Sequence, residues 1–300
     1  TQIVWIGFRI YRFIENQYTF LVRSMEVILA EHLGFCYGVK RAIEIARENA
    51  SPDGTSSTLG PIIHNPQMVA RLKNEGVGTV GSLDEMEDGL VIIRTHGVGP
   101  KVYEEAESRG LELVDATCPH VKKAQLSAKL LSEEGYTVVI VGEKNHPEVK
   151  SIFEWTGHGA HIIETEAEAE ALPRIGKLGI VSQTTFSAKR FQSIVSCLLE
   201  KSREIKILRT ICTATDLRQA AALELAEKVD VMLVIGGKNS ANTSRLAQIC
   251  ATKCKTYHIE TVAELQDEWM NHVNKIGITA GASTPDWIIK EVYKQCQSRA

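Results

Sequence analysis

Short apolar runs alternate along the chain with segments in which apolar residues recur every three or four positions. The runs are typical of buried strands, and the wider spacing is typical of amphipathic helices. The helical spacing is clear at Val39, Ala42 and Ala46, and it recurs over residues 119–135. Because strands that alternate with helices build parallel sheets, the pattern predicts an α/β fold.

One order of elements occurs three times: an apolar strand, a cysteine, an amphipathic helix, and a buried strand that ends in a polar loop. The cysteine segments read EVILAEHLGFC, LELVDATC and EIKILRTIC. Later in the second and third copies the letters nearly coincide, as VIVGEKN and VIGGKN. Each copy then closes with a further helix, strand and polar loop. We interpret the copies as three pseudo-threefold-related α/β units with mostly parallel sheets, at residues 25–118, 119–210 and 211–300.

Such an arrangement would bring three cysteines, Cys36, Cys118 and Cys212, toward a common axis. It would also place the polar loops there, because functional loops lie at the carboxyl ends of parallel strands. The alternative is a solenoid, in which the units stack in a row and the cysteines lie far apart.

Residues 1–24 do not fit the repeat and are predicted to be an extension outside the fold. The segment is rich in aromatic residues, and Arg9, Arg12 and Glu15 interrupt it where a signal peptide needs an unbroken apolar stretch. We favour an extension upstream of the start-like Met25 over a transit peptide.

The composition narrows the class of protein. The formal net charge is -3, with basic residues scattered rather than grouped, which argues against nucleic acid or membrane partners. No run reaches the roughly 18 uncharged apolar residues of a membrane span. The 7 cysteines form an odd number and include no Cys-x-x-Cys pair, which favours reduced thiols and a cytoplasmic location. The cysteines outside the repeated position are read as ordinary thiols: Cys197, Cys250, Cys254 and Cys296.

The three repeated cysteines suggest an iron-sulfur site. Three thiolates can hold three irons of a [4Fe-4S] cluster, which normally takes four cysteines, so the fourth iron would be open to bind a substrate oxygen. Each cysteine directly precedes a predicted helix, whose positive end is expected to lower the pKa of the thiol. A single cysteine at a strand end is more often a small buried residue, so the prediction depends on the threefold recurrence.

The polar loops contain side chains suited to a diphosphate. They lie at strand-to-helix turns, where backbone amides and helix N-termini favour anions. A lone loop histidine is more often a surface residue, and only the equivalent placement of several polar residues favours a binding site. The candidates are His64, His96, His146, Thr184, Ser240, Asn242 and Ser283, with Ala241 offering only its backbone amide.

Glu148, in His146-Pro147-Glu148, is the candidate proton donor. A carboxyl group in a partly desolvated pocket can have a raised pKa and protonate a leaving hydroxyl. The alternative is a solvated carboxylate at the start of the next helix.

These motifs resemble the LytB family of 4-hydroxy-3-methylbut-2-enyl diphosphate reductases. The resemblance covers residues 25–290 and includes GFCYGVKRA, LGPIIHNPQ, IIRTHG, DATCP, VGEKNHPEV, SQTT, ICTATDLRQ, GGKNSANT and TAGASTPDW. It implies a three-lobed α/β fold around a [4Fe-4S] cluster, with Cys36, Cys118 and Cys212 as ligands. Glu148 matches the family's proton-transfer residue. The residues that match its substrate binders are His64, His96, His146, Thr184, Ser240, Asn242 and Ser283.

The implied activity is the last step of the non-mevalonate route to isoprenoid precursors. Two electrons and two protons remove a hydroxyl group as water, giving isopentenyl and dimethylallyl diphosphate. A ferredoxin or flavodoxin is the implied electron donor. Two departures stand out: Ala241 replaces a Ser or Gly that is frequent in the family, and residues 1–24 have no counterpart in its compact bacterial forms.

Two other functions remain open from the sequence. A cluster-dependent dehydratase would also use an open iron but would need no external electrons. An electron carrier or metal-responsive protein would have a fully ligated cluster and no affinity for a diphosphate.

Overall fold

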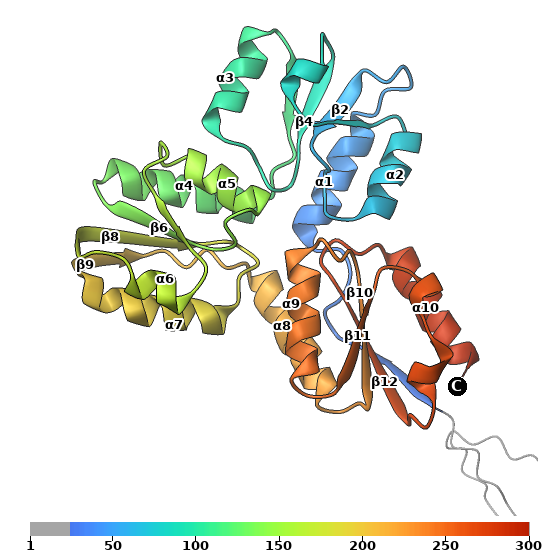
Figure 1. Cartoon of the computed structure of the whole chain (residues 1–300). Helices are drawn as coiled ribbons and strands as arrows, with labels where there is room; N and C mark the ends of the chain where they lie inside the picture. Colours follow the sequence, from blue (N-terminus) through green and yellow to red (C-terminus); the bar gives the residue numbers. More distant parts are fainter. Residues whose placement is uncertain (1–24, 300) are drawn as a thin grey trace, which may run out of the picture.

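The structure is a computed structural model that describes residues 25–299, and the prediction for residues 1–24 lies outside this range. The described chain forms three lobes around a common centre (Figure 1). Each lobe contains one four-stranded sheet, and every strand pairing is parallel. The predicted fold class, three α/β units with parallel sheets, is therefore confirmed.

The first sheet has the order β3-β2-β4-β5. Its strands are β2 (Ser56–Leu59), β3 (Gly78–Val80), β4 (Leu90–Ile93) and β5 (Glu112–Asp115). The helices of this lobe are α1 (Tyr37–Glu48), α2 (Pro66–Asn74) and α3 (Pro100–Ser108).

The second sheet has the order β7-β6-β8-β9. Its strands are β6 (Thr137–Val141), β7 (His161–Ile163), β8 (Ile175–Ser182) and β9 (Ser202–Ile207). Its helices are α4 (Pro119–Glu133), α5 (Pro147–Glu154), α6 (Glu166–Glu170) and α7 (Ala188–Leu198).

The third sheet has the order β1-β12-β10-β11. Its strands are β1 (Glu26–Leu29), β10 (Val231–Ile235), β11 (Lys255–Ile259) and β12 (Lys275–Ala280). Its helices are α8 (Thr213–Ala226), α9 (Ala241–Ala251) and α10 (Asp286–Ser298). Short 3-10 turns complete the described elements at Leu83–Glu85, Leu199–Lys201, Val262–Glu264 and Asp267–Met270.

Each strand that precedes a repeated cysteine is the edge strand of the previous sheet. Thus β5 belongs to the first sheet and leads to Cys118, and β9 belongs to the second sheet and leads to Cys212. Strand β1, which leads to Cys36, belongs to the third sheet, where it pairs with β12 in the register Val27 to Ile276. The chain therefore closes on itself, and each cysteine lies where it crosses from one lobe to the next. The unit boundaries near residues 118 and 210 stay predictions.

Each sheet is covered on both faces by apolar side chains. In the second sheet, Val139 and Val141 pack with residues of α6 and α7, whereas Val138 and Ile140 pack with residues of α4 and α5. Burial on both faces explains why the strands read as continuous apolar runs rather than as an alternation. Among the described residues, no helix is both long enough and apolar enough to cross a membrane.

Candidate active site

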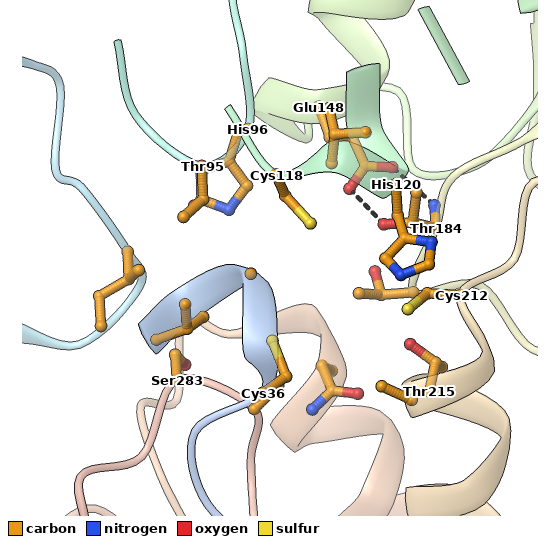
Figure 2. Close-up of a pocket in the computed structure, with 18 of the residues that line it drawn as sticks. Cys36, Thr95, His96, Cys118, His120, Glu148, Thr184, Cys212, Thr215 and Ser283 are labelled. Carbon is orange, nitrogen blue, oxygen red and sulfur yellow. Dashed lines mark hydrogen bonds between the residues drawn. The ribbon is translucent and has the colours of Figure 1, made fainter. Parts of the chain in front are cut away.

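A central cavity lies where the three lobes meet (Figure 2). Its volume is about 740 Å³, a value that includes space open to solvent. All the residues predicted for the site line it: Cys36, His64, His96, Cys118, His146, Glu148, Thr184, Cys212, Ser240, Ala241, Asn242 and Ser283.

The three cysteines occupy equivalent positions, because each is the N-cap residue of a helix. Cys36 precedes α1, Cys118 precedes α4 and Cys212 precedes α8. Their sulfur atoms point into the same space (Figure 2). The close approach depends on Gly38, since a Cβ atom there would lie 2.5 Å from the Cys118 sulfur. The solenoid alternative is therefore wrong.

The helix starts act on the thiols in the predicted direction, but the net pKa shift of two of the cysteines is upward. Burial raises the pKa of Cys118 to about 11 and also raises the pKa of Cys212, although backbone N–H groups at the helix starts act to lower both values. Burial outweighs the helix because a desolvated thiolate is costly. A bound metal deprotonates its thiol ligands, so metal binding here would release protons.

Arg218, which the sequence analysis did not single out, is a buried cation beside the cysteines. It is 4% exposed and lines the central cavity. Its guanidinium donates to the carbonyl oxygens of Gly34 (2.7 Å) and Ala214 (3.2 Å), and its buried Nε has no partner among the described residues. No carboxylate in residues 25–299 forms an ion pair with it.

Burial lowers the pKa of Arg218, and the negative charges of Cys36 and Cys212 as thiolates act to raise it. A buried cation is costly without a nearby anion. The donor set therefore fits an anionic group held by the cysteines. The sequence does contain a signal for Arg218, because it lies in helical phase with the buried Ala222 and Leu225.

Three imidazoles form one wall of the cavity, and we call His64, His96 and His146 the histidine wall. The ring centroids of His64 and His96 are 4.4 Å apart, and each lies about 5.5 Å from His146. One ring nitrogen from each residue lies within 4.8 Å of the other two, close enough to share one ligand. Such a ligand could be a metal ion or a phosphate group.

Several ring nitrogen atoms of the histidine wall remain available to contact a ligand. The backbone N–H of Glu148 donates to Nδ1 of His146 at 3.2 Å, so a neutral His146 keeps its proton on Nε2. Nε2 of His64 and Nδ1 of His96 are buried and have no hydrogen-bond partner in the described part of the chain. Burial is the main reason why the pKa values of all three are lowered, that of His146 to about 4. The positive charge of Arg94 acts in the same direction.

The third lobe contributes uncharged polar groups at the start of α9. Ser240 is the N-cap residue, and its hydroxyl accepts from the backbone N–H of Thr243 at 3.4 Å. Asn242 is 5% exposed, and neither its amide nitrogen nor its amide oxygen has a hydrogen-bond partner in the region that the structure describes. The hydroxyl of Ser283 donates to the carbonyl oxygen of His64 at 3.3 Å, which links the third lobe to the first. The unpaired amide of Asn242 is a further sign of a polar ligand site.

Glu148 is 2% exposed, so the alternative of a solvated carboxylate is wrong. The backbone N–H of Thr184 donates to one carboxyl oxygen at 2.6 Å, and the Thr184 hydroxyl donates to the other at 2.9 Å (Figure 2). Burial raises the pKa of Glu148 to about 7, although both bonds from Thr184 act to lower it. A carboxyl group with this pKa can hold or release a proton near neutral pH.

The cavity also contains residues that sequence reasoning did not name as candidates. Thr95, His120 and Thr215 line it together with Arg218. His120 and Thr215 follow their cysteines by two and three residues, so their proximity to the repeated position could have indicated them.

Fold and site together define a three-lobed α/β protein whose cavity combines a cysteine triad, the histidine wall and a protonatable carboxyl group. The chain belongs to the LytB protein family, whose pattern it matches over residues 27–297. It is 50% identical over 274 residues to the 4-hydroxy-3-methylbut-2-enyl diphosphate reductase of Geobacter sulfurreducens, covering 91% of this chain and 97% of that protein. The reductase of Pelobacter propionicus is 51% identical over 269 residues, covering 89% and 96%.

Solved structures agree with this assignment. One (E)-4-hydroxy-3-methyl-but-2-enyl diphosphate reductase, described as the terminal enzyme of the non-mevalonate pathway, is 47% identical with a TM-score of 0.66, covering 91% of this chain and 99% of the other. The E-1-hydroxy-2-methyl-but-2-enyl-4-diphosphate reductase of Plasmodium falciparum is 30% identical with a TM-score of 0.86, covering 91% and 88%. The resemblance seen in the sequence motifs is confirmed.

Proposed function

We propose that this chain is a 4-hydroxy-3-methylbut-2-enyl diphosphate reductase that acts in the last step of the non-mevalonate pathway. The observation that carries the proposal is the meeting of three N-cap cysteines, the histidine wall and a buried carboxyl group in one cavity. The names of the similar proteins support it.

Cys36, Cys118 and Cys212 would hold a [4Fe-4S] cluster, with Arg218 as its nearby counter-charge. The bound cluster would supply electrons and one open Lewis-acidic iron for the substrate oxygen. An external donor such as a ferredoxin or flavodoxin would provide the electrons, and we place the enzyme in the cytoplasm.

The chain's own residues would bind and orient the diphosphate. His64, His96 and His146 offer ring nitrogens, and Asn242 offers its unpaired amide. The hydroxyls of Ser240 and Ser283 and the backbone amide of Ala241 lie at the edges of the same space. Because Ala241 has no hydroxyl, its contribution is limited to the backbone.

Glu148 would deliver the proton that turns the leaving hydroxyl into water. The carbon–oxygen bond breaks, two electrons enter the allylic group, and a second proton is added to carbon. The Thr184 hydroxyl donates to Glu148 when Glu148 is ionised. When Glu148 is protonated, the bond can reverse, so that Thr184 accepts from the carboxyl O–H and donates to the leaving hydroxyl. A pKa of about 7 suits Glu148 to this role near neutral pH.

Anaerobic turnover of reconstituted protein tests the proposal directly. With 4-hydroxy-3-methylbut-2-enyl diphosphate and a chemical reductant, isopentenyl and dimethylallyl diphosphate should form only when the reductant is present. Conversion without reductant would instead support a dehydratase. A protein that contains the cluster but has no affinity for pyrophosphate would support an electron carrier.

Pyrophosphate binding should take up protons at the histidine wall. The imidazoles have lowered pKa values in the free protein, and a bound anion raises these values. The affinity for pyrophosphate should therefore increase as the pH falls through the pKa values of the anion-bound protein. We expect the wild type to take up roughly one proton more per pyrophosphate than a His64→Gln variant.

Calorimetry of the cluster-containing protein in two buffers of different ionisation enthalpy measures this uptake. The variant is the matched control, because the protonation of pyrophosphate itself contributes equally to both proteins. Equal proton uptake by the two would contradict a role for His64 in anion binding.

A further inference from the structure

A second cavity lies between the second and third lobes. Its volume is about 720 Å³ including space open to solvent, and it lies between the start of α7 and the start of α9. In Figure 1, α9 lies on the side of the third lobe that faces the second. Three basic side chains line this second cavity: Arg190, Lys238 and Arg245.

The second cavity adjoins the central one, because Thr185 and Ala241 line both. Each of these residues is the sequence neighbour of a candidate site residue, Thr184 or Ser240. A ligand that passes through the second cavity therefore arrives beside the proposed diphosphate site.

Neither arginine of the second cavity forms an ion pair with a carboxylate in the part of the chain that the structure describes. Arg190 donates to the carbonyl oxygen of Glu164 at 2.7 Å and lies 5.1 Å from the ring centroid of Phe186. Arg245 donates to the side chain of Gln248 at 3.0 Å, and its buried Nε has no partner within residues 25–299. Neither guanidinium group is therefore within ion-pair distance of a carboxylate among the described residues, although the charge of Arg190 acts on the nearby Glu143 carboxyl group.

The two arginines are close enough to affect each other. Burial, and then the positive charge of Arg190, lowers the pKa of Arg245. Lys238 is paired with Glu264, and Glu143 is the single acidic residue that lines the second cavity. Positive charge therefore predominates there.

Two helix starts add to the positive field. Ser187 is the N-cap of α7 and Ser240 is the N-cap of α9, and both residues or their neighbours line the second cavity. The N-terminal end of a helix attracts anions because its first N–H groups lack partners within the helix.

We propose that the second cavity is the entrance through which the diphosphate group reaches the central cavity, guided by Arg190 and Arg245. The inference rests on the proposed function in one respect, that the ligand is a diphosphate. Charges at an entrance stabilise the ligand on its way in more than they stabilise it when bound. Their loss therefore slows association and dissociation together.

Exchange of inorganic pyrophosphate, followed by ³¹P NMR on the cluster-containing protein, measures both rates. In an Arg190→Gln/Arg245→Gln variant, association should slow by roughly 3–10-fold at low ionic strength, with a smaller change in affinity. The difference should shrink in salt, because the screening length falls to about 8 Å at physiological ionic strength.

Two controls separate guidance from other effects. The Arg190→Lys/Arg245→Lys variant keeps both charges and should associate like the wild type. Arg203→Gln removes the same kind of charge from an exposed position on β9 and should have little effect.

An unchanged association rate in the double glutamine variant would overturn the proposal. A faster dissociation with an equal loss of affinity would also overturn it, because the arginines would then contact bound diphosphate instead of guiding it. Turnover of the wild type, measured on the same sample, tests the reductase function separately. If association depended on these charges but the wild type showed no turnover, the proposal of an entrance would stand and the proposed reductase function would fail.

Discussion

Glu148→Gln is expected to lower turnover by about 10²–10⁴-fold, the usual contribution of a positioned general acid, while the iron and sulfide content stays unchanged. Glutamine keeps the size of the side chain, and its amide can accept from the Thr184 backbone N–H and donate to the Thr184 hydroxyl in place of the two bonds that the carboxylate accepts. It cannot release a proton. Anaerobic turnover at saturating substrate, with iron counted in the same sample, measures the effect.

The pH profile makes this prediction sharper. Because Glu148 must be protonated to act as an acid, wild-type turnover should decline as the pH rises through about 7, the raised pKa of this carboxyl group. The residual turnover of Glu148→Gln should lack that decline.

Glu170→Gln is the matched control, since Glu170 is exposed on α6 and lines neither the central nor the second cavity. Its turnover at saturating substrate should resemble the wild type. Normal turnover in Glu148→Gln would exclude Glu148 as the proton donor.

Cys118→Ser should impair the assembly of the cluster itself. A serine hydroxyl is a much poorer iron ligand than a thiolate. The loss of affinity should exceed the roughly 10–100-fold that follows loss of a residue supporting a ligand. Iron and sulfide counts and the visible absorption spectrum after anaerobic reconstitution measure the result.

Cys197→Ser is the control for the cysteine change, because Cys197 lies in α7 and does not line the central cavity. It should retain the iron content of the wild type. If Cys118→Ser bound as much iron as Cys197→Ser, the scheme of three cysteine ligands would fail.

Local sequence patterns were enough to predict the lobes and the positions of the site residues. The phase of Val39, Ala42 and Ala46 marks the buried face of α1, and the recurrence of a cysteine before each helix indicated the central cavity. Both features depend on short-range spacing, which a single sequence displays directly.

Other features depend on contacts that no local pattern contains. The pairing of β1 with β12 joins residues near opposite ends of the described chain, and periodicity carries no information about such partners. The raised pKa of Cys118 follows from the depth of its burial, which the helix start alone does not reveal. Arg190 and Arg245 lie in different lobes, and they line one cavity only because the second and third lobes are side by side. The sequence spacing between them does not show this.

The pairing of β1 with β12 also determines when the third sheet can be completed during synthesis. During synthesis, β1 leaves the ribosome early, but its only neighbour in the third sheet is β12, the last strand of the described chain. Until β12 emerges, the edge of β1 is unpaired and is a possible site of association with other chains. Cys36 follows β1, so its final position depends on the completed third sheet. Any metal binding that needs all three cysteines in their final positions would therefore have to follow the emergence of β12.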